Sequence, residues 1–244
     1  MLLQLEGLTV RFGGVEALGP VDLSLAPGAS LGLMGPNGCG KTTLFNAISG
    51  VARPDGGRVL FGERDITVLP VHEIAKVGIA RTFQTVRLFP LLTVRDNVRP
   101  AAAPAHVGAE KATIERALEV AGLAAKSNVL AGELAIAEQR RLEIARALAR
   151  TPRLVLMDEP TAGLNPEETD ALVKLIADAV RPIAALILIE HKPDVVAALC
   201  PMAVLLDRGR KVAEAPPTDL FAGDAFRRAY LGAIDGSGGA RRCG

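Results

Sequence analysis

The fold is decided by the stretch Gly35-Pro36-Asn37-Gly38-Cys39-Gly40-Lys41-Thr42. Its glycines, spaced before a Lys-Thr pair, form the pattern of a phosphate-binding loop. The apolar run at residues 30–34 predicts a strand directly before the loop, and a helix is expected from about residue 41 to residue 50. A chance glycine turn is the alternative, but a loop between a strand and a helix is the context that the motif requires.

Each residue type in this loop has a physical reason. Glycines let the backbone curl until several N–H groups point at phosphate oxygens, and the following helix adds its positive N-terminal end. Lys41 would reach the β- and γ-phosphates, and the Thr42 hydroxyl would ligate Mg²⁺. ATP and Mg²⁺ are therefore the expected cofactors. The expected nucleotide contacts here are Gly35, Asn37, Gly38, Cys39, Gly40, Lys41, Thr42 and Thr43.

A second signal of a phosphate site is the acidic pair Asp158-Glu159, which follows the apolar run at residues 154–157. An acidic residue at the carboxyl end of a buried parallel strand faces the crevice where nucleotides bind. We expect Asp158 to hold Mg²⁺, directly or through water, and Glu159 to orient or deprotonate the attacking water. The alternative is a strand end that acidic residues merely cap.

Two further candidates are weak when taken alone. His191 ends another buried run, residues 185–189, and would contact the γ-phosphate there and sense its loss. The alternative is a structural histidine. Gln84 would coordinate Mg²⁺ and water, or it is simply a loop amide.

The composition of the chain narrows the class of protein to which it can belong. The chain has 244 residues, of which 49% are hydrophobic and 23% charged, as expected for a globular protein rather than a disordered one. A formal net charge of +1 gives no support for a nucleic-acid footprint, which needs a basic face. Neither a signal peptide nor a run long enough to cross a bilayer is expected, so a membrane role needs a partner. The three cysteines, expected as free thiols, are Cys39, Cys200 and Cys243.

The order of predicted elements favours one α/β domain. Strands alternate with helices, which implies a mainly parallel sheet with helices on both faces, beside a small antiparallel subdomain near the N-terminus. We expect the core at about residues 1–90 and 151–235 and a helical subdomain at about residues 91–150. We expect the tail, residues 236–244, to be disordered. A further helix should begin after the cap Asn165, with a buried stripe made of Leu172, Leu175, Ile176 and Ala179.

Five separated motifs, taken in order, resemble those of ABC transporter ATPases. They are residues 35–43, Gln84, residues 140–148, Asp158-Glu159-Pro160 and His191. The resemblance covers residues 2 to about 231. It implies a P-loop NTPase core of the RecA-like, ABC ATPase type, with catalytic roles for Lys41, Gln84, Glu159 and His191 and a metal site made by Thr42, Gln84 and Asp158.

The same resemblance gives a role to Phe12, which sits where the family places an aromatic ring that stacks on adenine. A core aromatic is the alternative. Residues 78–84, 140–146 and 229–232 look like those of the subunits of branched-chain amino-acid importers.

That resemblance implies an ATP-binding and ATP-hydrolysing subunit at the cytoplasmic face of the plasma membrane. Its partners would be transmembrane permease subunits, a second ATPase subunit, identical or homologous, and indirectly an external binding protein. No residue of this chain would contact the transported molecule, so that assignment rests on analogy.

One motif departs from the family. Its signature helix normally starts Leu-Ser-Gly-Gly-Gln, whereas this chain reads Leu134-Ala135-Ile136-Ala137-Glu138-Gln139. In the family these residues grip the γ-phosphate held by the opposite subunit. Ala135 lacks the hydroxyl, and the methyl group of Ala137 is expected to crowd the phosphate or block a positive φ. The alternative function is therefore a nucleotide-binding regulatory subunit with weak or no hydrolysis.

Overall fold

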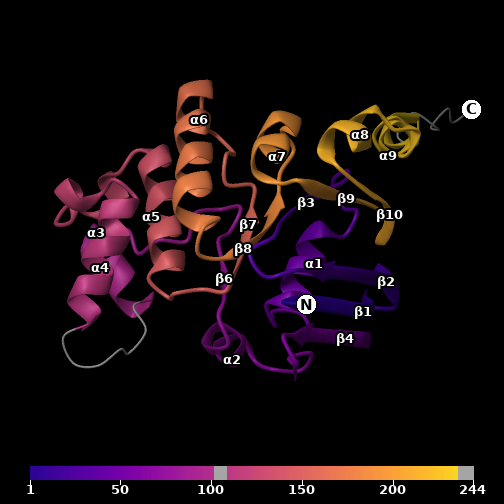
Figure 1. Ribbon diagram of the computed structural model, residues 1–244, viewed down its shortest axis with the longest axis horizontal. Helices are drawn as coiled ribbons and strands as arrows, with labels where there is room; N and C mark the ends of the chain where they lie inside the picture. Colours follow the sequence, from indigo (N-terminus) through magenta and orange to yellow (C-terminus); the bar gives the residue numbers. More distant parts are fainter. Residues whose placement is uncertain (102–108, 236–244) are drawn as a thin grey trace, which may run out of the picture. The chain divides into compact units, whose positions relative to one another are not determined.

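The computed structural model describes residues 1–101 and 109–235, with side chains from 110 to 230 in the second range. Figure 1 gives the labels of the helices and strands. The chain forms two compact units. Unit 1 holds residues 1–25, 31–70 and the chain from 189 onward, and unit 2 holds residues 26–30 and 71–188. The tail and its expected disorder lie outside the described residues.

Unit 1 contains a small antiparallel sheet, as the sequence predicts. Its strands are β1 (Leu3–Phe12), β2 (Val15–Leu25), β4 (Gly56–Phe61) and β5 (Arg64–Asp65), in the order β2-β1-β4-β5. All three strand pairs are antiparallel. Along β1 and β2 buried apolar residues alternate with more exposed ones, the pattern of a sheet with one face on the core.

The rest of unit 1 carries the predicted strand, loop and helix. The strand β3 (Ser30–Met34) pairs in parallel with β9 (Met202–Asp207), which pairs antiparallel with β10 (Arg210–Ala215). All five residues of β3 are buried, as expected for a parallel strand covered on both faces. The helices are α1 (Lys41–Ile48), α7 (Pro193–Leu199), α8 (Pro217–Ala222) and α9 (Asp224–Asp235).

Unit 2 combines buried strands with the larger set of helices. Its strands are β6 (Ile79–Arg81), β7 (Leu154–Asp158) and β8 (Ala185–Ile189), in the order β8-β7-β6, with β6 parallel to β7. The α-helices are α2 (Val71–Lys76), α3 (Val94–Val98), α4 (Ala109–Val120), α5 (Ile136–Leu148) and α6 (Pro166–Leu175). Short 3₁₀ turns lie at Arg99–Ala101, Ala124–Lys126 and Ala131–Glu133.

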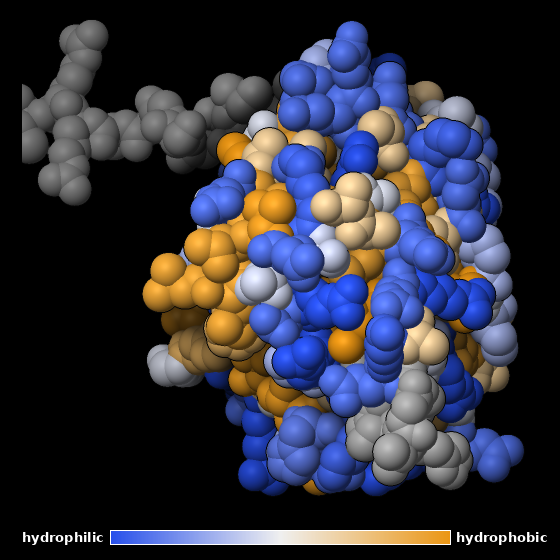
Figure 2. All heavy atoms as spheres, turned by 90° about the vertical axis from the view of Figure 1, so that its left-hand side faces the viewer, coloured by the Kyte–Doolittle hydropathy of each residue, from blue (hydrophilic) through white to orange (hydrophobic). Residues whose placement is uncertain are grey.

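Helices α3, α4 and α5 lie side by side (Figure 1) around an apolar cluster of their own. Val98, Leu118 and Leu142 are among its buried residues. This cluster supports a helical subdomain, although its boundaries at about 91 and 150 stay a prediction. Figure 2 looks at this side of the molecule and shows apolar residues gathered among polar ones. Exposed large apolar residues of this part of the chain include Phe89, Leu91, Leu92 and Ile136.

The helix after Asn165 differs from the prediction in its second half. Asn165 caps α6 as expected, since its side chain accepts from the Glu168 N–H at 2.9 Å. Leu172 and Ile176 are buried, but Leu175 and Ala179 are only half-buried, so the predicted stripe is wrong at those two positions. The helix also continues into a π-helical turn at Ile176–Val180. Leu175 and Ala179 line a cavity beside this face, so no side chains cover them fully.

Two further predictions concern the cysteines and membrane-spanning segments. Cys39 and Cys200 are buried thiols, while Cys243 lies outside those residues. Within residues 1–101 and 109–235, every helix is too short or too polar to cross a membrane.

Candidate functional site

The predicted phosphate-binding loop lies between β3 and α1 with the backbone that its glycines require. Gly35, Gly38 and Gly40 all adopt the left-handed region, with φ of 147°, 76° and 108°. A Cβ on Gly35 would come within 2.1 Å of the Leu206 carbonyl oxygen, and one on Gly40 within 2.9 Å of the Ala17 oxygen. Only glycine fits these two positions, because a side chain would be strained and would also collide with backbone.

The start of α1 is open to an anion. Gly40 is its cap residue, no side chain caps the helix, and no acidic residue lies in its first turn. The Lys41 side chain is buried, and its ammonium donates to the Gly35 carbonyl at 2.7 Å and to the Pro36 carbonyl at 3.0 Å. Thr42 is exposed and Thr43 half-buried on the same turn. The positive helix end and a lysine held over the loop are what phosphate groups require.

Tyr230, for which the sequence predicts no role, forms a hydrogen bond to this loop. The hydroxyl of Tyr230 on α9 accepts from the Gly35 N–H at 3.2 Å, and its ring stacks on Phe226 with centroids 4.4 Å apart. Burial raises the pKa of Tyr230, so its hydroxyl stays neutral near neutral pH. Its only sequence signals are that it is the single tyrosine of the chain and lies in the family-like stretch 229–232.

Cys39 holds the loop through its backbone. Its carbonyl accepts from the Gly209 N–H at 2.9 Å, and the Gly209 carbonyl accepts from the Gly19 N–H at 2.9 Å. Burial raises the pKa of the Cys39 thiol, against the opposing effect of Lys41. The side chain is therefore a neutral thiol near pH 7 and serves as packing.

Two other predicted residues of unit 1 are exposed. Phe12 ends β1 and its side chain is 55% exposed, which excludes the alternative of a core aromatic. His191 is exposed directly after β8, and its backbone N–H donates to the Glu190 carboxylate at 2.9 Å. An exposed ring is accessible to a ligand, but the role of each residue stays a prediction.

In unit 2, Asp158 is the last residue of β7 and is buried. Its carboxylate pairs with the Arg81 guanidinium, on the neighbouring strand β6, at 3.5 Å. Burial lowers the pKa of Arg81, and the Asp158 carboxylate acts against that shift. The buried carboxylate therefore has a cation as its partner, which offsets part of the cost of burying its charge. The sequence pattern predicts no such partner for Arg81.

Glu159 turns away from the strand through a strained backbone. Its φ is 48°, a region that non-glycine residues rarely adopt and that costs roughly 1–2 kcal/mol. The half-buried carboxylate accepts from the Gln84 amide at 3.0 Å. Two residues predicted independently therefore meet, 75 positions apart in the chain. The turn aims the carboxylate of Glu159 differently from that of Asp158.

The loop that carries Gln84 is tied to α5 by Arg140. The Arg140 guanidinium donates to the Phe83 carbonyl at 3.0 Å and to the Gln84 carbonyl at 2.7 Å. It also pairs with Glu143 at 3.2 Å, and both side chains are buried. Glu143 in turn accepts from the Arg87 N–H at 3.2 Å. Burial raises the pKa of Glu143, and these donors oppose the shift.

Residues 134–139, which depart from the family's signature motif, form the start of α5. Ala135 is the cap residue and provides no side-chain cap, as its missing hydroxyl implies. The Glu138 carboxylate accepts from the Ala135 N–H at 3.2 Å and from the Lys126 ammonium at 2.5 Å. The hydrogen bond from Lys126 is the main reason that the pKa of Glu138 is lowered.

The concern that Ala137 blocks a positive φ is wrong. Ala137 is the second residue of α5, and the described non-glycine residues with positive φ are Thr151, Glu159 and Arg208. Because the position is helical, alanine fits it better than glycine does. Crowding of a phosphate by the Ala137 methyl group stays a prediction.

Comparison with known proteins identifies the family of the chain. Residues 18–162 match the family model described as ABC transporter. The chain is 38% identical to the high-affinity branched-chain amino acid transport ATP-binding protein BraF of Pseudomonas aeruginosa, over 95% of this chain and 98% of that protein.

Solved structures agree with the sequence match. The ADP conformation of MJ1267, an ATP-binding cassette of an ABC transporter, superposes with a TM-score of 0.85 at 28% identity and covers 95% of this chain and 98% of its own. A dimeric post-hydrolysis state of the cassette MJ0796, bound to ADP and Pi, has a TM-score of 0.76 at 26% identity and covers 88% of this chain and 98% of its own. The chain therefore belongs to the ABC transporter family and has the fold of its ATP-binding cassettes.

Proposed function

We propose that this chain is the ATP-binding and ATP-hydrolysing subunit of a membrane importer for branched-chain amino acids. The observation that carries hydrolysis is the contact between the Gln84 amide and the Glu159 carboxylate, placed beside the buried Asp158. The substrate rests on the similarity to BraF, which spans nearly the whole of both chains, because no residue of this chain would contact the transported molecule.

ATP would be held mainly through its phosphates. The left-handed glycines and the uncapped start of α1 supply backbone N–H groups, and Lys41 would exchange the Gly35 and Pro36 carbonyls for phosphate oxygens. Asn37, Cys39 and Thr43 belong to the same loop and helix start. The exposed ring of Phe12 would stack on adenine.

The donor set fits Mg²⁺, which prefers hard oxygen ligands. Thr42 offers a hydroxyl, Gln84 a side-chain amide oxygen and Asp158 a carboxylate. When bound, the ion would neutralise charge on the phosphate oxygens. Rotation of the Gln84 side chain would present its oxygen while its nitrogen leaves Glu159.

Hydrolysis would proceed by in-line attack of water without a covalent enzyme intermediate. The water oxygen would bond to the γ-phosphorus while the bond between that phosphorus and the ADP oxygen breaks. Glu159 would accept the proton that the water loses. Lys41 would stabilise charge on the phosphate oxygens, and His191 would contact the γ-phosphate and sense its loss. The strained backbone of Glu159 is the kind of device found at such sites.

The partners would be permease subunits, a second ATPase subunit and, indirectly, an external binding protein, with this chain peripheral to the cytoplasmic face of the plasma membrane. A groove of about 560 Å³ in unit 2 offers a docking place for a permease segment. The Arg87 guanidinium lies over the Phe83 ring, 4.1 Å from its centroid, on one wall of this groove. The second ATPase subunit would supply its own signature, while Ala135, Ala137 and Glu138 of this chain would face the nucleotide of that subunit.

The test is the rate of Mg²⁺-dependent ATP hydrolysis against protein concentration for the purified chain. If two copies close on ATP, the rate per molecule should rise with concentration. Glu159→Gln should keep ATP binding and lower the rate by about a hundredfold or more, because it removes the proton acceptor. Glu63→Gln, an exposed acid in the turn after β4, is the matched control and should leave the rate unchanged.

One observation favours a second candidate, a nucleotide-binding regulatory subunit. The start of α5 lacks the hydroxyl of the family signature and carries the acidic Glu138 in its first turn. That candidate predicts ATP binding with a rate no higher than that of Glu159→Gln, even after permease subunits and the branched-chain amino-acid binding protein are added. Stimulation of the rate by leucine-loaded binding protein in the reconstituted complex would support the importer instead.

A further inference from the structure

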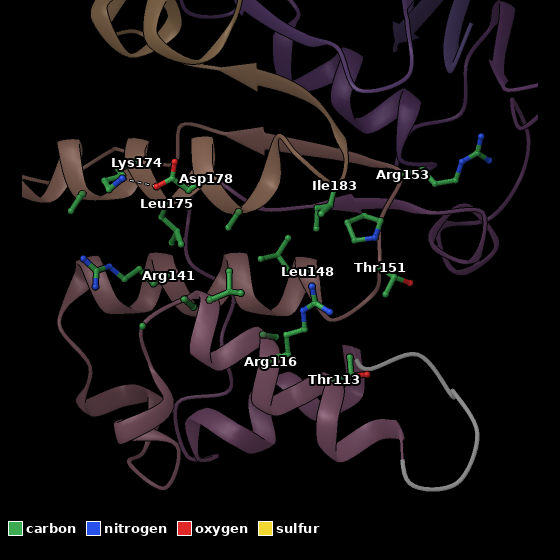
Figure 3. Close-up of a pocket in the computed structure, with 17 residues that line it drawn as sticks. Thr113, Arg116, Arg141, Leu148, Thr151, Arg153, Lys174, Leu175, Asp178 and Ile183 are labelled. Carbon is green, nitrogen blue, oxygen red and sulfur yellow. Dashed lines mark hydrogen bonds and ion pairs between the residues drawn. The ribbon is translucent and has the colours of Figure 1, made fainter.

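Unit 2 contains a larger cavity that no predicted site residue lines. Its volume is about 990 Å³, near the upper end of the range typical of small-molecule sites. Figure 3 shows it between the paired helices α4 and α5 on one side and α6 with its π-helical turn on the other. The loop from α5 to β7 closes one end through Thr151 and Pro152.

The walls of this cavity are mainly apolar. Leu148 at the end of α5, Leu175 on α6 and Ile183 before β8 point into it (Figure 3). Ile183 is 55% exposed and Val120 is 38% exposed, so water wets large apolar side chains here. Leu175 and Ala179, which the sequence predicts as buried, are half-buried because they face this space. An apolar ligand would remove that surface from water.

The cavity includes an arginine that forms no ion pair among the described residues. Lys174 pairs with Asp178 at 2.7 Å on one edge, and the charge of Arg141 acts on Glu138. Arg116 makes no ion pair with any residue in 1–101 or 110–230. Arg116 is exposed to solvent, and Figure 3 shows its guanidinium reaching from α4 toward Leu148 at the side of the cavity. A guanidinium in this position is suited to a carboxylate, which it binds through two parallel hydrogen bonds.

Two irregularities of the backbone shape the same walls. The π-helical turn at Ile176–Val180 contributes Asp178 and Ala179, and Thr151 adopts a φ of 48° although it is β-branched. Both features cost stability relative to regular structure, and both are found preferentially at functional sites. Their occurrence on one cavity, which no predicted site residue lines, argues that its shape has a use.

We propose that this cavity binds a small amphipathic carboxylate, with its apolar chain among the apolar residues and its carboxylate on Arg116. The apolar walls select the chain, and the unpaired cation selects an anionic head group over a neutral one. The ligand would contact the C-terminal end of α5, the helix whose first turn carries Ala135, Ala137 and Glu138.

The absence of tryptophan from the sequence allows a direct binding test. Ile183→Trp places a single fluorescent reporter at the exposed edge of the cavity. Titration with decanoate below its micellar range should give a saturable change in emission, and decanol, which has the same tail without the charge, should bind more weakly. A linear or absent response to decanoate would overturn the proposal.

The head-group contact has its own matched pair of variants in the reporter background. Arg116→Gln should weaken decanoate binding by about tenfold or more and leave decanol binding unchanged, because a charge-assisted hydrogen bond is lost. Lys111→Gln, an exposed cation on the same helix outside the cavity, should change neither. Equal weakening by both variants would mean general attraction to a basic surface and would contradict a built site.

A substitution that fills the cavity tests whether the ligand binds there. Ala171 lines the cavity but is exposed on α6, so Ala171→Phe should fold and should remove the binding of both probes. Its thermal unfolding midpoint, compared with that of the reporter protein, shows that the fold is retained. Undiminished decanoate binding in this variant would place the ligand elsewhere and overturn the assignment.

Discussion

The first turns of α1 and α5 look alike in one respect and differ in another. Both helices begin without a side-chain cap, at Gly40 and at Ala135. The first turn of α1 has no acidic residue and is preceded by three left-handed glycines. The first turn of α5 contains Glu138, which takes up the Ala135 N–H. The N-terminus of α1 is therefore open to an anion. At the start of α5, the helix's own Glu138 carboxylate already accepts the Ala135 N–H.

The two regions are also held in place differently. The phosphate-binding loop is held by a backbone hydrogen bond to the Cys39 carbonyl and by two side chains. Lys41 donates to the Gly35 carbonyl, and the Tyr230 hydroxyl accepts from the Gly35 N–H. The region of α5 depends on the buried side chains of Arg140 and Glu143. This difference teaches that the loop requires glycine at positions 35 and 40, whereas the α5 region depends on a charge network that substitutions can dissect.

The largest expected effect comes from removing Arg140. Arg140→Met leaves the Glu143 carboxylate buried without its cation and takes the donors away from the Phe83 and Gln84 carbonyls. Breaking a buried pair from one side should lower the free energy of unfolding by about 3–5 kcal/mol. Urea denaturation measures the loss. Arg99→Met, which breaks exposed pairs with Asp96 and Glu110, should cost less than about 1 kcal/mol, and an equal loss in both would contradict the comparison.

A double variant separates stability from turnover. Arg140→Met with Glu143→Leu removes both charges and should recover most of the lost stability. Its rate of ATP hydrolysis should stay low if Arg140 positions the loop of Gln84, since neither new side chain can donate to the carbonyls. Recovery of both quantities would show that Arg140 acts only through stability.

A smaller effect is expected at Ala137. Glycine at this helical position should lower the free energy of unfolding by about 0.5–1 kcal/mol, because it adds backbone entropy to the unfolded chain. No gain in the rate of hydrolysis should follow from relief of backbone strain, since the position has none. Ala135→Gly, at the cap residue, is the control and should be neutral or slightly stabilising. A severalfold rise in the rate for Ala137→Gly would restore the view that the methyl group crowds the phosphate.

Prediction from sequence succeeded where structure is local. The β3 strand, the loop and α1 follow one another in the chain, so residue types and spacing determine them, and the cap Asn165 is equally local. The pairing of Gln84 with Glu159 needed the order of β6 and β7 in the sheet. The roles of Arg81, Arg140 and Tyr230 could not be read from spacing, because each depends on a partner more than 50 positions away. The π-helical turn has no sequence signal that periodicity would detect.

The smallest effect tests the self-capped start of α5 through pH. The pKa of Glu138 is lowered from its ordinary value of 4.5, mainly by Lys126. Its stabilising contribution is therefore fully present above that value and is lost as pH falls through the folded-state pKa. Glu138→Gln should lower stability near neutral pH by about 0.5 kcal/mol, because the contact is largely exposed to solvent. Thermal unfolding of both proteins at several pH values should show the difference shrinking once the pH falls below 4.5.

The same variant sharpens the comparison of the two helix starts. Glutamine removes the negative charge from the first turn of α5, so this end becomes more like that of α1 and more favourable for the phosphate of an opposing subunit. ATP-dependent association of Glu159→Gln chains should therefore strengthen when Glu138→Gln is added, despite the small loss of stability. Weaker association would mean that the hydrogen bond from Ala135 to Glu138 is needed to shape the helix start, and that this end of α5 works as a capped helix and not as an open anion site.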